Sequence, residues 1–207
     1  MVKRKGNERM KNKVDELVEV LNLLKQVDDT SCQEDITERI RLNLKKSYKI
    51  EKPIILDSVL DVKIEKSDKE KGSLKSALWV ARFMMMYYNT RFILSLEELE
   101  EAYNKANYTM NIEDMEDFIV DVADSSTSQK GNLIYSVTKG ADFWKEVNDA
   151  VIIKQLVVIR LKKKFAVVAG VTEKGIILRT NTGKKTISFK KLKKDIVSII
   201  SIYSAEI

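Results

Sequence analysis

Histidine is absent from the 207 residues of this chain, and cysteine and proline occur once each. Without an imidazole, the Cys-His and Ser-His pairs of most hydrolases lack their general base, and the common zinc sites lack a preferred ligand. The single thiol, Cys32, cannot form an internal disulfide and is interpreted as a bystander, which favours a reducing cytoplasm. We therefore expect a cytoplasmic protein without histidine-dependent catalysis, a metal or a cofactor.

Glycine and long apolar runs are also scarce. The seven glycines are too dispersed to build a phosphate-binding loop, which argues against nucleotide hydrolysis. No apolar run approaches the roughly 20 residues that cross a bilayer, and the basic start has no apolar core behind it, so we expect neither a membrane partner nor a secretory signal. Few glycines, one proline and abundant Lys, Glu and Ile indicate a heat-adapted source.

The net charge of +6 is divided into two blocks of opposite sign. Residues 95–124 hold ten acidic side chains and one basic one, Lys105. Residues 154–195 hold thirteen basic side chains and two acidic ones. Such polarity indicates either that the blocks match each other within the molecule or that a basic face meets an anionic partner.

The first 52 residues have helical periodicity. One helix carries Val14, Leu17 and Leu21 on an apolar stripe, which we expect to pack on its own domain; pairing with a second copy of the chain is the alternative. A capping box of Ser31 and Glu34 predicts a second helix that ends near Lys46. We treat residues 1–52 as a helical extension and residues 53–207, which begin at the proline, as the main domain.

The main domain begins with a predicted strand and three predicted helices. Alternating apolar and charged residues predict a half-buried strand over residues 60–65. Residues 73–88 are apolar nearly all round, which is typical of a helix buried in the centre of a domain. A capping box of Ser95 and Glu98 and an N-cap at Asn111 begin the next two helices.

From about residue 132 onward, the pattern of apolar residues predicts mainly β-strands. The predicted strands are 132–137, 156–159, 165–171, 175–178, 186–189 and 196–203, with a hairpin turn at Thr182-Gly183 and short helices at 142–148 and 189–194. Helices followed by an antiparallel sheet define the α+β class.

Several local patterns stand in the same order as in a known family. Ser73-Leu-Lys-Ser-Ala-Leu78 opens the buried helix, and Ser95-Leu-Glu-Glu-Leu99 opens the next. Lys164-Phe-Ala-Val-Val168 begins a strand, and Arg179-Thr-Asn-Thr-Gly183 forms the turn after the following strand. Over about residues 60–203, this arrangement resembles the papain-like peptidases that process double-glycine leader peptides, and their non-peptidase relatives.

The resemblance implies a papain-like fold that has lost its catalytic residues. Ser73 stands in the place of the family's cysteine, Lys164 in that of its histidine and Arg179 in that of its aspartate. Residues 65–67, Glu-Lys-Ser, stand where the oxyanion glutamine belongs. We therefore expect a non-enzyme, a pseudopeptidase whose cleft binds a protein or a peptide.

The alternative is a nucleic-acid-associated protein that binds phosphates through its lysine-rich C-terminal sheet and helix. The candidate residues are Lys162, Lys163, Lys184, Lys185, Lys190, Lys191, Lys193 and Lys194. A helix-turn-helix version is disfavoured, because the third middle helix begins with the acidic run 112–117 and would be repelled by DNA.

A third hypothesis, ranked last, is a hydrolase with a Ser73–Lys164 dyad. Lysine runs such as 162–164 are normally solvated, and Ser73 also fits an ordinary helix N-cap. The tripeptide Asp61-Val-Lys63 matches half of a metal-dependent nuclease core, but a second carboxylate on a preceding strand has no convincing candidate. Neither pattern replaces the binding-module hypothesis.

Overall fold

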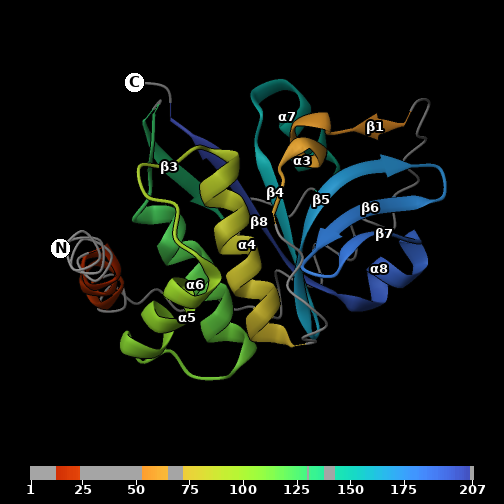
Figure 1. The fold of residues 1–207 in the computed structure, drawn as a ribbon. Helices are drawn as coiled ribbons and strands as arrows, with labels where there is room; N and C mark the ends of the chain where they lie inside the picture. The colour runs from red at the N-terminus through yellow and green to blue at the C-terminus, as the bar shows by residue number, and fades with distance from the viewer. Residues whose placement is uncertain (1–12, 24–52, 65–71, 130, 138–142, 206–207) are drawn as a thin grey trace.

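The computed structural model describes residues 13–23, 53–64, 72–129, 131–137 and 143–205 (Figure 1). Within these ranges a first helix, 13–23, precedes the elements of the main domain. These are β1 (Ile54–Ile55), α3 (Asp57–Asp61), α4 (Ser73–Tyr87), α5 (Leu96–Lys105), α6 (Ile112–Asp124), β2 (Thr127–Ser128), β3 (Gly131–Ser136), α7 (Phe143–Ile153), β4 (Leu156–Leu161), β5 (Lys164–Thr172), β6 (Gly175–Thr180), β7 (Gly183–Ile187), α8 (Phe189–Asp195) and β8 (Ile196–Ser204). The predicted α+β class is confirmed.

In the described part of the chain, eight strands form one open antiparallel sheet, and seven of them follow the order β2-β3-β8-β4-β5-β6-β7. β1 pairs with β5 through Ile54–Val171 and Ile55–Gly170, beyond the part of β5 that pairs with β4. Every residue of β4 is buried. Helices cover the central strands on both faces, so these strands are continuous apolar runs rather than alternating ones.

Two sets of contacts assign the helices to the faces of the sheet. Arg160 of β4 contacts Glu116 of α6, and Arg179 of β6 lies over the Phe83 ring of α4, so α4 and α6 share one face. Ser201 of β8 donates a hydrogen bond to Glu146 of α7 on the opposite face. The rings of Trp144 in α7 and Phe189 in α8 are 5.4 Å apart, which places α8 on the α7 face as well.

Helix α4 is the centre of the first layer, as predicted. Its side chains are buried along nearly its whole length, because it lies between β5 and the helices α5 and α6 (Figure 1). The predicted caps of α5 and α6 are confirmed: Ser95 and Glu98 form a capping box, and the Asn111 side chain accepts a hydrogen bond from the Asp114 backbone.

Helix 13–23 confirms the first predicted helix and packs on the body of the chain. Val14 and Leu21 are buried, and Asp15 forms an ion pair with Lys105 of α5 at 2.7 Å. Its apolar stripe therefore contributes to the chain's own core. The predicted second helix with its Ser31 cap, the residue Cys32 and the segment 65–67 lie outside the described residues. None of the described helices is long and apolar enough to cross a membrane.

The predicted strand over residues 60–65 is wrong at its start. The segment 57–61 forms α3, which buries Val59 completely, and the strand of this region is β1. Alternation over Leu60, Val62 and Ile64 fits a strand, but the carbonyls of this segment are satisfied by Arg179 instead of by a strand partner. Helix α7 also extends to Ile153, five residues beyond its predicted end.

Candidate functional site

The N-terminus of α4 is fastened to the beginning of β5. The Ser73 hydroxyl donates a hydrogen bond to the Lys163 carbonyl at 2.8 Å. The Ser76 hydroxyl donates to the Ser73 carbonyl at 2.7 Å and accepts from the Phe165 amide at 3.0 Å. The helix N-cap is Gly72, so Ser73 is the first helical residue and not the cap that its type suggests. The hydroxyl proton of Ser73 is thus held by a backbone carbonyl.

Lys164 directs its side chain away from α4. Phe165 pairs with Arg160, whose guanidinium contacts Glu116 on the α4–α6 face of the sheet. Side chains alternate between the two faces along a strand, so Lys164 lies on the α8 face. The backbone at 163–164 therefore lies beside Ser73, whereas the Lys164 ammonium group lies on the opposite face of the sheet.

Arg179 supports α3 and does not lie beside Lys164. Its guanidinium donates to the carbonyls of Val59 and Val62, both at 2.7 Å. The guanidinium carbon also lies 5.1 Å from the centre of the Phe83 ring. Arg179 pairs with Val167, three residues along β5 from Lys164. This arginine closes the C-terminal end of α3, whose last carbonyls have no helical partner.

The α8 face contains a cavity of about 250 Å³ that we call the basic pocket. It lies between the β4–β5 turn, β7 and α8. Its lining residues are Leu161, Lys162, Lys163, Lys164, Lys185, Ile187, Lys191 and Asp195. In the described part of the chain, the lining therefore combines five lysines, one aspartate and two apolar residues.

Within the basic pocket, the charges of Lys185 and Lys191 repel the Lys164 ammonium group. Partial burial lowers the pKa of Lys164 below its ordinary value, and the charges of Lys185 and Lys191 lower it further, while Asp195 opposes the shift. Burial disfavours an ammonium ion because it removes part of its hydration. An anion in the pocket would relieve this repulsion.

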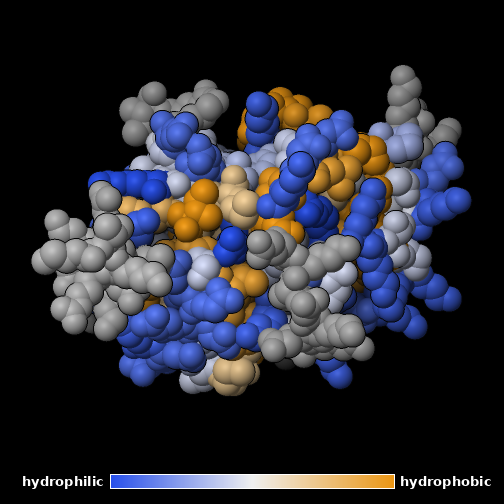
Figure 2. All heavy atoms as spheres, in the orientation of Figure 1, coloured by the Kyte–Doolittle hydropathy of each residue, from blue (hydrophilic) through white to orange (hydrophobic). Residues whose placement is uncertain are grey.

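The eight lysines predicted for nucleic-acid binding are divided by the structure. Lys162, Lys163, Lys185 and Lys191 line the basic pocket. Lys184 pairs with Arg179 and so lies on the α4 face. Three more are on α8 outside the lining: Lys190, Lys193 and Lys194. Figure 2 shows hydrophilic residues gathered over the β6, β7 and α8 end of the molecule.

Sequence reasoning missed three features of the pocket. Lys164 belongs to it, although its position was assigned to the lost catalytic set. Ile187 and Asp195 also line it. Side chains alternate along a strand, so Lys185 and Ile187 of β7 lie on the same face of the sheet. This alternation indicates from the sequence that the two residues lie side by side. No sequence signal brings α8 against the β4–β5 turn, where the Lys162 amide donates to the Asp195 carbonyl at 2.9 Å.

A second cavity, of about 370 Å³, lies where α3, the end of α4 and the end of α7 meet. Tyr87 and Tyr88 line it, together with Ile153 and Lys154. The Tyr87 hydroxyl donates to the Lys154 carbonyl at 3.0 Å, and burial raises the pKa of Tyr88. Both tyrosines therefore remain neutral and take part in hydrogen bonds.

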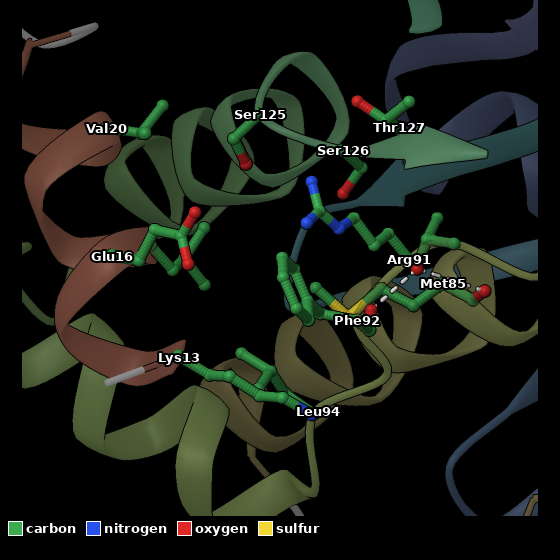
Figure 3. Close-up of a pocket in the computed structure, with 12 residues that line it drawn as sticks. Lys13, Glu16, Val20, Met85, Arg91, Phe92, Leu94, Ser125, Ser126 and Thr127 are labelled. Carbon is green, nitrogen blue, oxygen red and sulfur yellow. Dashed lines mark hydrogen bonds between the residues drawn. The ribbon is translucent and has the colours of Figure 1, made fainter. Parts of the chain in front are cut away.

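A third pocket, of about 150 Å³, separates helix 13–23 from the end of α4 (Figure 3). The Glu16 carboxylate and the Arg91 side chain point into it from opposite sides, with Phe92 between them (Figure 3). Arg91 lies over the Phe92 ring at 5.2 Å. The mixture of charges and the small volume suit packing between two elements rather than a ligand of one charge.

The chain is thus an α+β protein with an open antiparallel sheet and a lysine-lined pocket on one face. Among the described residues, no three Cys, Asp or Glu side chains group as a metal site would require. No family model, curated protein or solved structure is significantly similar to this chain.

Proposed function

We propose that this protein is a non-catalytic, papain-like domain that acts as a protein- or peptide-binding module, a pseudopeptidase. One observation carries the proposal: the three positions that correspond to the family's catalytic residues are engaged in other contacts. Ser73 binds the Lys163 carbonyl, Lys164 lines the basic pocket, and Arg179 binds the carbonyls of α3. The Ser73 and Arg179 side chains join separate elements, the Lys164 side chain lies on the other face of the sheet, and the three do not converge on one reacting atom.

The arrangement of elements supports the papain-like part of the proposal. A central buried helix, α4, precedes the antiparallel sheet in the chain and packs against β5. Its N-terminus lies beside the beginning of that strand, where the family's cysteine and histidine meet. The departure from the family is the direction of the Lys164 side chain, which argues against Ser73 and Lys164 as a catalytic pair.

An apolar surface at the end of α7 supports the binding part of the proposal. Val151, Ile152 and Ile153 are consecutive and more than half exposed, with Ile152 at 78%. They adjoin the 370 Å³ cavity, whose lining includes Ile153 and Tyr87. Three adjacent exposed aliphatic side chains are unusual on a soluble surface and are typical of a contact site. Figure 2 shows this apolar region over α7.

Two measurements test the proposal. A panel of peptide and ester substrates should give no turnover above the uncatalysed rate, and Ser73→Ala should leave that result unchanged. A turnover that disappears in Ser73→Ala would overturn the non-enzyme assignment.

Peptides selected from a display library should bind the wild-type chain and lose at least about tenfold in affinity with Ile152→Asp. Met110→Asp is the matched control, because Met110 is also apolar and 70% exposed but lies between α5 and α6. Equal losses in both variants would mean that the α7 surface is not the binding site.

A second candidate function, association with nucleic acid, is favoured by the basic pocket and by the lysines of α8 beside it. Phosphate contacts by lysine weaken steeply with salt. Retention on a duplex column that vanishes at moderate salt would support this candidate, whereas salt-insensitive capture of one defined peptide would support the binding module.

A further inference from the structure

We propose that the basic pocket is a binding site for a compact phosphate group: a phosphate monoester, inorganic phosphate or pyrophosphate. This site goes beyond peptide binding at α7, because it lies at the β5, β7 and α8 end of the sheet and has the opposite chemistry. It depends on Lys164, Lys185 and Lys191, which come from three different elements.

The elements that carry these lysines are fixed by contacts of their own. The Ser188 side chain caps α8 by accepting from the Lys191 amide, and Leu192 anchors the helix because it is completely buried. The β4–β5 turn is tied to α8 by the hydrogen bond from the Lys162 amide to the Asp195 carbonyl. The cations are therefore presented by a preformed frame, which reduces the entropy lost on binding.

The charge of the pocket indicates a ligand with more than one negative charge. Among the described residues, five lysines and one aspartate line the pocket, and partial burial together with the charges of Lys185 and Lys191 disfavours the charged form of Lys164. A terminal phosphate carries about −1.5 to −2 at neutral pH, whereas the phosphodiester of a nucleic-acid backbone carries about −1. The excess of positive charge matches the terminal group better.

The residue types that line the pocket further restrict the class of ligand that it could bind. The cations that line the described part of the pocket are lysines, which bind phosphate as point charges and contact several of its oxygens. Among the described lining residues there is no aromatic side chain on which a base could stack, which disfavours single-stranded nucleic acid. Leu161 and Ile187 would contact the carbon body of a monoester.

Calorimetry on the full chain tests the site, with pyrophosphate, inorganic phosphate and phenyl phosphate as ligands and acetate as the comparison at equal ionic strength. We expect binding of at least one phosphate ligand and none of acetate. Tighter binding of phenyl phosphate would identify a monoester as the source, and tighter binding of pyrophosphate would identify an inorganic one.

Lys164→Met and Lys185→Gln should each weaken phosphate binding by at least about tenfold. Lys174→Gln should not, because Lys174 is an exposed lysine at the β5–β6 turn outside the lining. Lys185 is exposed, so its variant tests the site even if Lys164→Met fails to fold. Equal binding of acetate, or an equal loss in Lys174→Gln, would overturn the site. So would a DNA duplex that binds more tightly than all three phosphates and is weakened equally by Lys174→Gln.

Discussion

The charged ammonium group of Lys164 destabilises the folded protein. Burial lowers its pKa from the ordinary value of 10.5, with Lys185 and Lys191 acting in the same direction. Since the unfolded chain holds this proton more tightly, the cost is fully present below the folded-state pKa. It disappears as the pH rises toward 10.5.

Lys164→Met should therefore raise the melting temperature in phosphate-free buffer at pH 7, by about 1 to 3 °C for a chain of this size. The gain should shrink as the pH approaches 10, and melting curves across this range measure it. Lys174→Met, at an exposed turn, should show no such trend. A loss of stability that is the same at every pH would contradict the account.

The roles of single residues were the hardest feature to predict from the sequence. Ser73 and Arg179 were assigned by analogy to a lost active site, yet their partners are backbone carbonyls at residues 163 and 59–62, which lie 90 or more positions away in the chain. A hydrogen bond to a distant carbonyl depends on no partner side chain. The sequence pattern therefore cannot predict such a hydrogen bond.

At the scale of elements, the N-terminal caps are the features that local sequence determines most directly. The Ser95 hydroxyl accepts from the Glu98 amide at 3.1 Å, and the Glu98 carboxylate accepts from the Ser95 amide at 2.7 Å. Ser95→Ala removes one acceptor and should destabilise the protein by about 1 kcal/mol. Urea denaturation measures the loss, and Ser95→Asp should retain most of the stability because it still accepts the bond. Equal losses for both variants would show that the cap does not act through this hydrogen bond.

The elements that were predicted well are those whose signals are local. Helix α4 follows from its apolar faces, helices α5 and α6 follow from apolar faces and caps, and the strands β4, β5, β6 and β8 follow from continuous apolar runs. The predicted strand 60–65 is wrong at its start, because residues 60 and 61 belong to α3, which Arg179 of β6, far along the chain, stabilises. The predicted end of α7 is too early. Val151, Ile152 and Ile153 form the last turn of this helix, and because all three are exposed, no apolar periodicity distinguishes them from a loop.

At the scale of the whole molecule, two buried glutamates, one on each face of the sheet, link a helix to the strands beneath it. Glu116 of α6 accepts from Arg160 of β4 and from Ser198 of β8. On the opposite face, Glu146 of α7 accepts from Gln155 and from Ser201 of β8. The two serines are three residues apart on one strand, so their side chains lie on opposite faces.

Arg160 also shows how the two charge blocks of the sequence meet. It forms ion pairs with Glu116 and Glu113, and in the described part of the chain it is the member of the basic block that pairs with the acidic block. Among the described residues, no ion pair joins a lysine of the basic pocket to the acidic block. Internal pairing thus explains the acidic helix α6, while the basic pocket retains its positive charge for a ligand.

Because the Arg160–Glu116 pair is buried on both sides, its loss should be costly. Both side chains are about 5% exposed, so removing the arginine leaves an uncompensated carboxylate between α6 and the sheet. Arg160→Met should destabilise the protein by about 3 to 5 kcal/mol in guanidinium denaturation. Lys145→Met, which breaks the exposed pair with Asp149, should cost about 0 to 1 kcal/mol.

Adding Glu116→Gln to Arg160→Met should restore part of the stability, because the neutral amide can still accept from Ser198 and no longer carries a buried charge. The coupling between the two substitutions, measured by a double-mutant cycle, should exceed about 1 kcal/mol. Additive losses would show that the two side chains act independently. In that case the helix layer would depend on its apolar contacts alone, and the charge blocks would have no structural role in joining α6 to the sheet.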